Sequence, residues 1–489
     1  MTGINQRNRQ RGVSLFGGVD LVAVSLYLLL TVIGVAAVFS ASWNESAENM
    51  FALSHNYMKQ VMWLGLSWVA ALIILLLDSS VWHKFAYFLY GAGILILLLT
   101  FIPGIGVKVN GATAWLGVGG FRVQPMEFTK IAVALATARL ASGYSFSVTK
   151  IGDLFRLALL IFAPLAIAVL QNDLGSGLVL ASFLFMLYRE GLNNWITIPI
   201  LFIAALFILS FLYTPTTLLI ALIILFTFSA AMMAPDRWTL CVKYVAALFI
   251  VSTLLFVVAT FTIESANYYY CLLITTIVSM LGVLVYAFRT ALRNLYILVA
   301  LFFASVMILP TSDLVYNNIL EHHQQKRIQT FLGLAKDATA DYNVNQSKIA
   351  IGSGGFWGKG YLEGSQIRYG FVPERHTDFI FCTIGEEWGF VGAAILLSLI
   401  CALILRLMRM GDNQQETFGR VYCYCVASIL LFHTFINIGM TMGVVPVMGI
   451  PLPFISYGGS SLFAFTILLF IAFSLDASTR KGLPTYGTK

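Results

Sequence analysis

Long apolar runs separated by short polar segments dominate the pattern along the chain. Three of the clearest cover residues 21–39, 61–77 and 244–261. Each run approaches the roughly 20 apolar residues that a helix needs to cross a bilayer. None of them alternates at period two, as the strands of a membrane barrel do. The pattern therefore predicts an all-α, polytopic integral membrane protein.

We expect about 14 transmembrane helices, taking apolar runs of roughly 17–25 residues as spans. The fourth run is interrupted by polar residues, and the sixth is short. The spans between 193 and 310 contain few ionisable residues, which favours a lipid-facing or scaffolding role. The expected spans cover residues 19–41, 57–77, 82–102, 125–141, 153–170, 174–187, 193–212, 217–233, 244–262, 268–288, 294–310, 386–408, 420–443 and 461–477.

The basic residues predict how these spans are oriented. With the N-terminus placed inside and the helices alternating, 18 of the 29 Lys and Arg residues fall in inner loops or the adjacent span ends. The short outer connections near 42–56, 171–173, 213–216 and 263–267 hold none. This distribution favours an even number of helices with both termini cytoplasmic. The net charge of +7 is thus explained by topology, and we expect no nucleic-acid partner. The first apolar run is too long for a cleaved signal and is interpreted as a retained anchor.

Three irregular segments fall on the predicted outer face. The long one covers residues 311–385, and 15 of the 76 residues in 311–386 are charged, against 36 of the other 413. A shorter loop covers 103–124. In the third, 444–459, three prolines preclude a continuous helix. Non-helical backbone at membrane depth needs protein or a water-filled cavity to satisfy it, so we expect the working site on the outer side.

Two sets of polar residues interrupt the spans near that face. Glu127 and Lys130 follow Gln124 and are three residues apart, so on a helix they share one face and can pair. They indicate either a site or a salt bridge that joins helices. Gln171 and Asp173 separate two apolar runs. Two interpretations are equally open for these residues: a functional role, and a turn in which Asp173 caps the next helix.

The long loop carries the remaining candidates. Its glycine-rich stretch 351–360 fits neither nucleotide-binding glycine motif, and the adjacent His322 and His323 are poorly spaced for a shared metal. We expect no nucleotide and no haem. The stretch 371–390 is unusually polar, and its last acids, Glu386 and Glu387, are expected to begin the next span, where acids suit a helix N-terminus. The further candidates of the loop are Lys326, Arg327, Asp337, Glu374, Arg375, His376 and Asp378.

These residue types limit the chemistry. Cations can hold an anionic lipid head group, and a carboxylate can deprotonate a hydroxyl as a general base. The same groups also suit an ion path in a transporter. An enzyme acting at the outer membrane face, a transporter and a scaffold for another protein therefore remain open at this point.

Several long motifs, in order, resemble those of the SEDS family (shape, elongation, division and sporulation). They are PERHTDFIF and GEEWGFVGA in 373–393, QSKIAIGSGGFWGKGYLEGSQ in 346–366 and GIPLPFISYGGSSL in 449–462, supported by NGATAW, QPMEFTK and QNDLGSG. The amino-acid sequences of these motifs resemble the elongation (RodA) branch more closely than the division (FtsW) branch. The motifs add Trp115, Lys359 and Ser456 to the expected cavity residues.

The resemblance implies a peptidoglycan glycosyltransferase that polymerises lipid II onto a lipid-linked glycan at the outer face of the cytoplasmic (inner) membrane during cell elongation. It implies a class B penicillin-binding protein and other elongation-complex membrane proteins as partners, and Mg²⁺ or Mn²⁺ as a candidate cofactor. A lipid-linked sugar flippase and the FtsW-type paralogue are the alternatives. It also implies a core of ten spans in one domain (1–489). Our count of apolar runs exceeds that core by about four, and we expect the extra helices in 193–310.

The resemblance assigns the essential loop carboxylate to Asp337, with Asp341 as a rival because the spacing to Tyr342 is one residue short. The essential Glu and Lys of the family map to Glu127 and Lys130. The chain departs from the family pattern at three positions, Ala114, Asn172 and Ala338. The first departure puts one expected cation contact in doubt.

Overall fold

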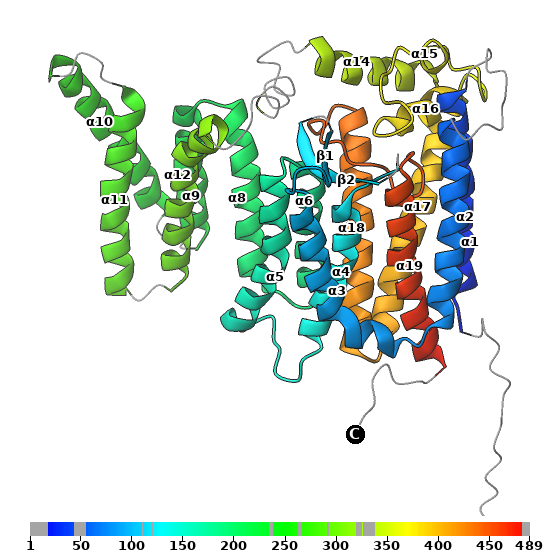
Figure 1. Cartoon of the computed structure of the whole chain (residues 1–489). Helices are drawn as coiled ribbons and strands as arrows, with labels where there is room; N and C mark the ends of the chain where they lie inside the picture. The colour runs from blue at the N-terminus through cyan, green and yellow to red at the C-terminus, as the bar shows by residue number, and fades with distance from the viewer. Residues whose placement is uncertain are drawn as a thin grey trace, which may run out of the picture. The chain divides into compact units, whose positions relative to one another are not determined.

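The computed structural model describes residues 18–43, 55–109, 111–118, 121–233, 238–262, 267–290, 293–318, 325 and 338–481. The chain forms two compact units. Unit 1 comprises Met1–Leu192 and Lys336–Lys489, and unit 2 comprises Asn193–Ala335. Figure 1 shows their elements coloured along the chain.

Unit 1 is a helical bundle with a small sheet. Its long helices are α1 (Leu21–Ser42), α2 (Asn56–Leu76), α3 (Ser80–Leu99), α4 (Pro125–Ala141), α5 (Ile151–Leu170), α17 (Gly389–Asn413), α18 (Thr417–Thr441) and α19 (Gly459–Arg480). A broken segment comprises α6 (Leu174–Leu178), the 3₁₀ turn η1 (Val179–Ser182) and α7 (Phe183–Arg189). The helices α14 (Ala338–Ser353), α15 (Ser365–Arg368) and α16 (Ile380–Glu387) lie at one end of the bundle (Figure 1).

Over its described residues, unit 2 contains five helices around its own apolar core. They are α8 (Asn194–Leu212), α9 (Pro215–Met233), α10 (Trp238–Thr262), α11 (Tyr268–Thr290) and α12 (Arg293–Asn318). The core includes Leu219, Ile223, Phe226 and Phe302, and α12 packs against both α8 and α9. The one-domain assignment and the extra-helix role of 193–310 stay predictions.

The expected class of an all-α membrane protein is confirmed. Each of the 14 expected ranges overlaps a helix or, for 174–187, the broken segment α6–η1–α7. Within the described residues, ten helices are long and apolar enough to cross a membrane. The exact number of spans and the orientation of the termini stay predictions.

The loops contain more regular structure than expected, since α14 and α15 lie within the segment 311–385 that was predicted to be irregular. The loop 103–124 contains an antiparallel sheet of β1 (Gly106–Val109), β2 (Ala112–Val118) and β3 (Phe121–Val123), in the order β1-β2-β3. Val107 pairs with Trp115, and Leu116 pairs with Val123. The strands hydrogen-bond to their neighbours in the chain. This pairing provides partners for backbone N–H and C=O groups that lie outside any helix.

Three helices form the interior of unit 1, namely α4, which is buried over most of its length, and the pair α18 and α19. Over their apolar windows α18 is 78% buried and α19 is 83% buried, whereas the other helices that qualify as spans are 11–39% buried. The segment 442–458 between α18 and α19 is non-helical, as its prolines predicted. α1 approaches it closely, since a Cβ on Gly34 would lie 2.2 Å from the Phe454 carbonyl oxygen.

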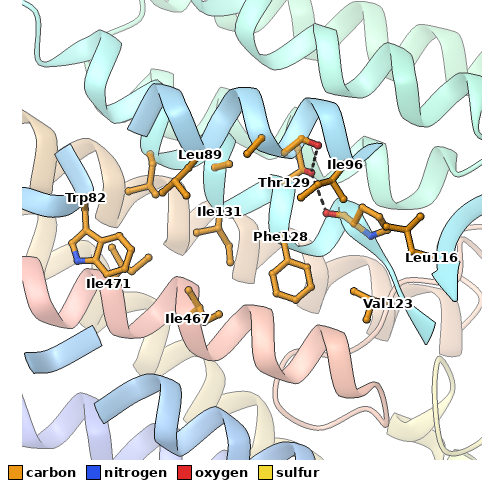
Figure 2. A pocket seen from close by; sticks show the side chains of 15 residues that line it. Trp82, Leu89, Ile96, Leu116, Val123, Phe128, Thr129, Ile131, Ile467 and Ile471 are labelled. Carbon is orange, nitrogen blue, oxygen red and sulfur yellow. Dashed lines mark hydrogen bonds between the residues drawn. The ribbon is translucent and has the colours of Figure 1, made fainter. Parts of the chain in front are cut away.

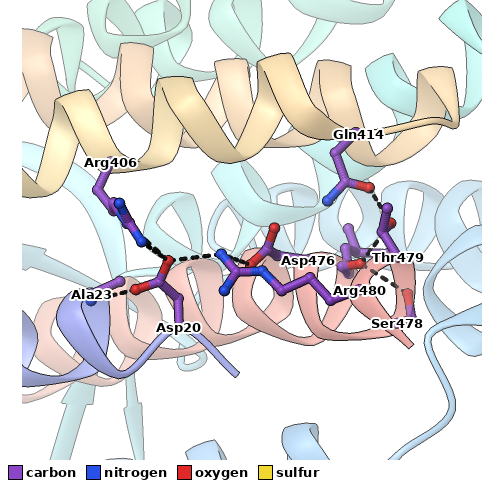
Figure 3. Close-up of polar contacts among 9 residues, drawn as sticks. Asp20, Ala23, Arg406, Gln414, Asp476, Ser478, Thr479 and Arg480 are labelled. Carbon is purple, nitrogen blue, oxygen red and sulfur yellow. Dashed lines mark hydrogen bonds and ion pairs between the residues drawn. The ribbon is translucent and has the colours of Figure 1, made fainter. Parts of the chain in front are cut away.

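At the opposite end of the bundle, an ionic cluster joins three helices (Figure 3). Asp20 caps α1 by accepting from the Ala23 amide at 3.1 Å. Its other oxygen lies 2.7 Å from guanidinium nitrogens of both Arg406 and Arg480. Burial alone would raise the pKa of Asp20, but these hydrogen bonds lower it below its usual value. The ends of α1, α17 and α19 are thereby fixed together.

Candidate functional site

The centre of the candidate site is a buried ion pair on α4. Proline at the first position of this helix is favourable because no hydrogen-bond donor is needed there. Glu127 lies in the first turn, and Lys130 follows one turn later. Their charged atoms are 2.9 Å apart, and each side chain is only 2% exposed. The pairing expected from their spacing is therefore present, while their role in a reaction stays a prediction.

A histidine from another helix completes the surroundings of Lys130. Its ammonium lies 2.9 Å from Nε2 of His433 on α18 and 5.2 Å from the centre of the Phe465 ring. Nδ1 of His433 lies 3.1 Å from the Pro451 carbonyl oxygen. A carbonyl only accepts, so Nδ1 carries the proton and Nε2 accepts from Lys130.

One turn further along α18, the Asn437 side chain forms hydrogen bonds with two other segments of the chain. Its amide nitrogen donates to the carbonyl oxygens of Ile450 at 2.7 Å and Asp378 at 2.8 Å. His433 and Asn437 thus connect the buried pair to the non-helical segment 442–458 and to the segment containing Asp378. Our sequence analysis missed both residues. Two polar residues four apart in the apolar run 420–443 share a helix face, and this was the available signal.

The second set of candidates has well-defined structural roles. Asp173 caps α6 by accepting from the Ser176 amide at 3.3 Å, and it also accepts from the Gln124 side chain at 2.6 Å. Gln171 is fully buried and donates to the Leu97 carbonyl at 2.9 Å. The capping interpretation thus fits the geometry, and both residues fix the ends of helices beside the sheet. Their contact with a substrate stays a prediction.

Glu386 organises the end of the long loop. Its carboxylate is fully buried and lies 2.6 Å from the Lys359 ammonium. It also accepts from the backbone amides of Gln366 and Ile367 at 3.0 Å each. A buried carboxylate needs such partners, so Lys359 and Glu386 together hold 359–367 in place.

The expectation that Glu386 and Glu387 begin the next span is wrong. Both residues end α16, and α17 begins only at Gly389. Gly389 has φ +65, and a Cβ there would lie 2.2 Å from the Gly358 nitrogen, so the chain turns sharply between the two helices. Glu386 therefore faces the loop rather than a helix N-terminus. Glu387 accepts from the Ser40 hydroxyl, and burial raises its pKa to about 7.

The PERHTD stretch packs against two other segments. Glu374 closes a local turn by accepting from the Thr377 hydroxyl at 2.9 Å. Nε of Arg375 donates to the Ala41 carbonyl at 2.7 Å. The His376 carbonyl accepts from the Tyr457 amide at 2.8 Å, and burial lowers the pKa of the His376 ring below its usual value.

Ser456 closes a turn before α19, and Trp115 lies in the small sheet. The Ser456 hydroxyl accepts from the Leu452 amide at 2.8 Å and so closes the turn before α19. Trp115 is half-buried in β2. Its neighbour Ala114 is 1% exposed, so the position where the family pattern has an arginine is an apolar contact here.

An apolar groove of about 330 Å³ lies along another face of α4 (Figure 2). It lies between α3, α4 and α19, from Trp82 and Ile471 at one end to Leu116 and Val123 of the sheet at the other. Phe128 lines it and directly follows Glu127 in the chain. The Thr129 hydroxyl on its wall is satisfied by the Pro125 carbonyl at 3.0 Å. The groove is therefore suited to a hydrocarbon chain.

Several candidates lie outside the described residues. These are Asp337, Lys326, Arg327, His322 and His323, and the side chain of Asp341 is likewise not described. Among the residues that the structure describes, no three His, Cys, Asp or Glu side chains are grouped so as to hold a metal ion.

Comparison with known proteins gives consistent relatives. Residues 20–219 and 219–481 match the family model FTSW_RODA_SPOVE, described as "Cell cycle protein". The peptidoglycan glycosyltransferase RodA of Treponema pallidum is 32% identical over 471 residues, covering 96% of this chain and 99% of that protein. The peptidoglycan glycosyltransferase MrdB of Escherichia coli K12 is 29% identical, covering 91% and 90%.

Solved structures share the fold. The structure described as "Structural coordination of polymerization and crosslinking by a peptidoglycan synthase complex" contains a chain with a TM-score of 0.59 at 23% identity, covering 94% of this chain and 98% of that one. The Thermus thermophilus rod shape determining protein RodA gives a TM-score of 0.54 at 22% identity, covering 94% and 97%. Since the family model spans nearly the whole chain, this multi-pass membrane protein belongs to the FtsW/RodA/SpoVE family of cell cycle proteins.

Proposed function

We propose that the protein is a peptidoglycan glycosyltransferase of the elongation type, which polymerises lipid II at the outer face of the cytoplasmic membrane. Its family and its relatives named RodA and MrdB support the activity. One structural observation carries the proposal furthest. On α4, Phe128 lines the apolar groove while the adjacent Glu127 pairs with buried Lys130. The same helix thus has an apolar face suited to a polyprenyl chain and, on a different face, a buried charged pair.

The proposed reaction is a single inverting displacement. Asp337 accepts the proton of the 4-hydroxyl of the acceptor lipid II. The resulting oxygen attacks the anomeric carbon of the lipid-linked donor glycan, and the bond to polyprenyl diphosphate breaks. An α-linked donor then gives a β-linked product. Negative charge develops on the departing diphosphate, which cations must stabilise.

The proposed cations are Lys130, Lys326, Arg327 and Arg375. Lys130 already neutralises Glu127, and His433 holds its ammonium in place. Mg²⁺ or Mn²⁺ is a further candidate and would supply positive charge to the diphosphate.

The test is polymerisation of lipid II by the purified full-length protein in detergent. We expect Asp337→Ala to abolish polymer formation and Asp341→Ala, the matched control, to retain it. Normal polymerisation by Asp337→Ala would refute the base assignment, and the reverse result would assign the base to Asp341. Absence of polymer from the wild-type protein, combined with lipid II transport across vesicles, would favour a flippase.

A class B penicillin-binding protein is the proposed partner. A solved structure with the same fold belongs to a peptidoglycan synthase complex that coordinates polymerization and crosslinking. The same assay should therefore be run with and without the transpeptidase. We expect the partner to increase the rate of polymerisation.

A further inference from the structure

A second cavity lies at the end of unit 1 opposite to the candidate site. Its volume is about 570 Å³, and its walls come from the start of α3, the end of α4, the loop 142–150 and the start of α5. The polar residues on these walls are His83, Tyr87, Arg139, Ser142, Tyr144, Ser145, Asp153 and Arg156. The charge pattern predicts this end to be cytoplasmic.

The cavity carries positive charge. The Arg139 guanidinium contacts the His83 ring, which holds it at the wall. Arg156 projects from α5 with its side chain 71% exposed, so its charge is available to a ligand. The Lys150 ammonium donates to the Ser145 carbonyl on the rim at 2.9 Å, which adds a third cation nearby.

Asp153, the one carboxylate among the described residues of the cavity wall, is already engaged. Asp153 accepts from the Ser147 amide at 3.1 Å through one oxygen. Its other oxygen lies 3.6 Å from Arg156, and the Asp153 side chain is only 13% exposed. Arg139, Lys150 and Arg156 against Asp153 therefore leave a positive excess, which favours an anionic ligand with several acceptor oxygens.

The surroundings favour a lipid over a soluble anion. On α5, Ile151, Phe155 and Leu159 are 87%, 68% and 62% exposed, and they recur every four residues on one face. In a membrane protein such a face contacts acyl chains. Tyr87 lines the cavity and is 50% exposed, as expected of an aromatic side chain at the membrane–water interface.

We propose that this cavity binds the phosphodiester head group of an anionic phospholipid, with its phosphate between Arg139 and Arg156 and its acyl chains along the exposed face of α5. Each cation near a membrane surface contributes about 1 kcal/mol to binding of an anionic lipid. Loss of both arginines should therefore weaken binding roughly 30-fold, which corresponds to about 2 kcal/mol.

The test is native mass spectrometry of the full-length protein, titrated with phosphatidylglycerol or with phosphatidylcholine of identical acyl chains. We expect tighter binding of phosphatidylglycerol and a roughly 30-fold loss in Arg139→Gln/Arg156→Gln. The matched control, Lys84→Gln/Arg409→Gln, removes two exposed positive charges that do not line the cavity. It should bind as the wild type does. Because the first double variant could fold poorly, Ser142→Glu tests the site with both arginines present, and its added negative charge should also weaken binding.

Three results would overturn the proposal. One is equal affinity for the two lipids. Another is wild-type affinity for phosphatidylglycerol in either Arg139→Gln/Arg156→Gln or Ser142→Glu. The third is complete displacement of phosphatidylglycerol by inorganic phosphate alone, which would identify a site for the free anion instead.

Discussion

The buried pair of Glu127 and Lys130 makes a strong prediction about stability. Both side chains are 2% exposed. Lys130→Met leaves the Glu127 carboxylate without its cation, and its second oxygen already lacks a hydrogen-bond partner among the described residues. Removing one member of a buried pair costs about 3–5 kcal/mol, so we expect a loss near the upper value. Glu127→Gln should cost less, because Lys130 keeps His433 and a neutral acceptor.

The double variant Glu127→Gln/Lys130→Met should be more stable than either single variant. It removes both charges and keeps the side-chain volumes, and such replacements of buried pairs are often close to neutral. The assay is unfolding of the purified protein by SDS titrated into mild detergent, with polymerisation of lipid II measured on the same samples. Recovered stability without activity would indicate a direct role in the reaction. Single-variant losses that simply add in the double variant would refute the reasoning.

Three further predictions concern the surroundings of the site. Asn437→Ala removes the donor to the carbonyls of Ile450 and Asp378, so it should destabilise by about 2–6 kcal/mol at 1–3 kcal/mol per unsatisfied group. Thr434→Val, which loses only a bond within α18, should change SDS unfolding far less, and equal effects would contradict the assignment. Burial raises the pKa of Glu387 from 4.5 to about 7, so its contribution to stability is complete below pH 4.5 and is lost as the pH rises towards 7. Glu387→Gln should therefore melt at a higher temperature than the wild type at pH 8 but not at pH 4, and identical melting curves at pH 8 would exclude this linkage. Gly389→Ala should lower the melting temperature because φ is +65 and the new Cβ would meet backbone, whereas the control Gly352→Ala, with open space around it, should melt as the wild type does.

Much of the fold could be predicted from the sequence because long apolar runs identify membrane spans. The pairing of Glu127 with Lys130 followed from their spacing, and the capping by Asp173 was an open alternative. The roles of Glu386 and Glu387 could not be predicted. The direction of these two side chains depends on the sharp turn at Gly389 between α16 and α17. The sequence alone does not show that this glycine adopts a positive φ angle. The sheet β1–β3 was missed because its strands are short.

The contacts of His433 and Asn437 depend on tertiary structure. Their spacing placed them on one face of a helix, but it could not identify Lys130, Pro451 or Ile450 as partners. These contacts join segments far apart in the chain, from α4 to the loop before α19. The base assignment to Asp337 stays a prediction that rests on the family resemblance.

The burial of α18 and α19 has a consequence for the response of the protein to bilayer thickness. A bilayer that is too thin or too thick acts on helices through their lipid-facing surfaces. α3 and α5, each 22% buried, present such surfaces, whereas α18 at 78% and α19 at 83% present little. His433 and Asn437 are attached to the shielded helix, so hydrophobic mismatch should tilt the outer helices before it shifts these residues. Reconstitution in lipids of different chain length should therefore change stability more than it changes the geometry of the site.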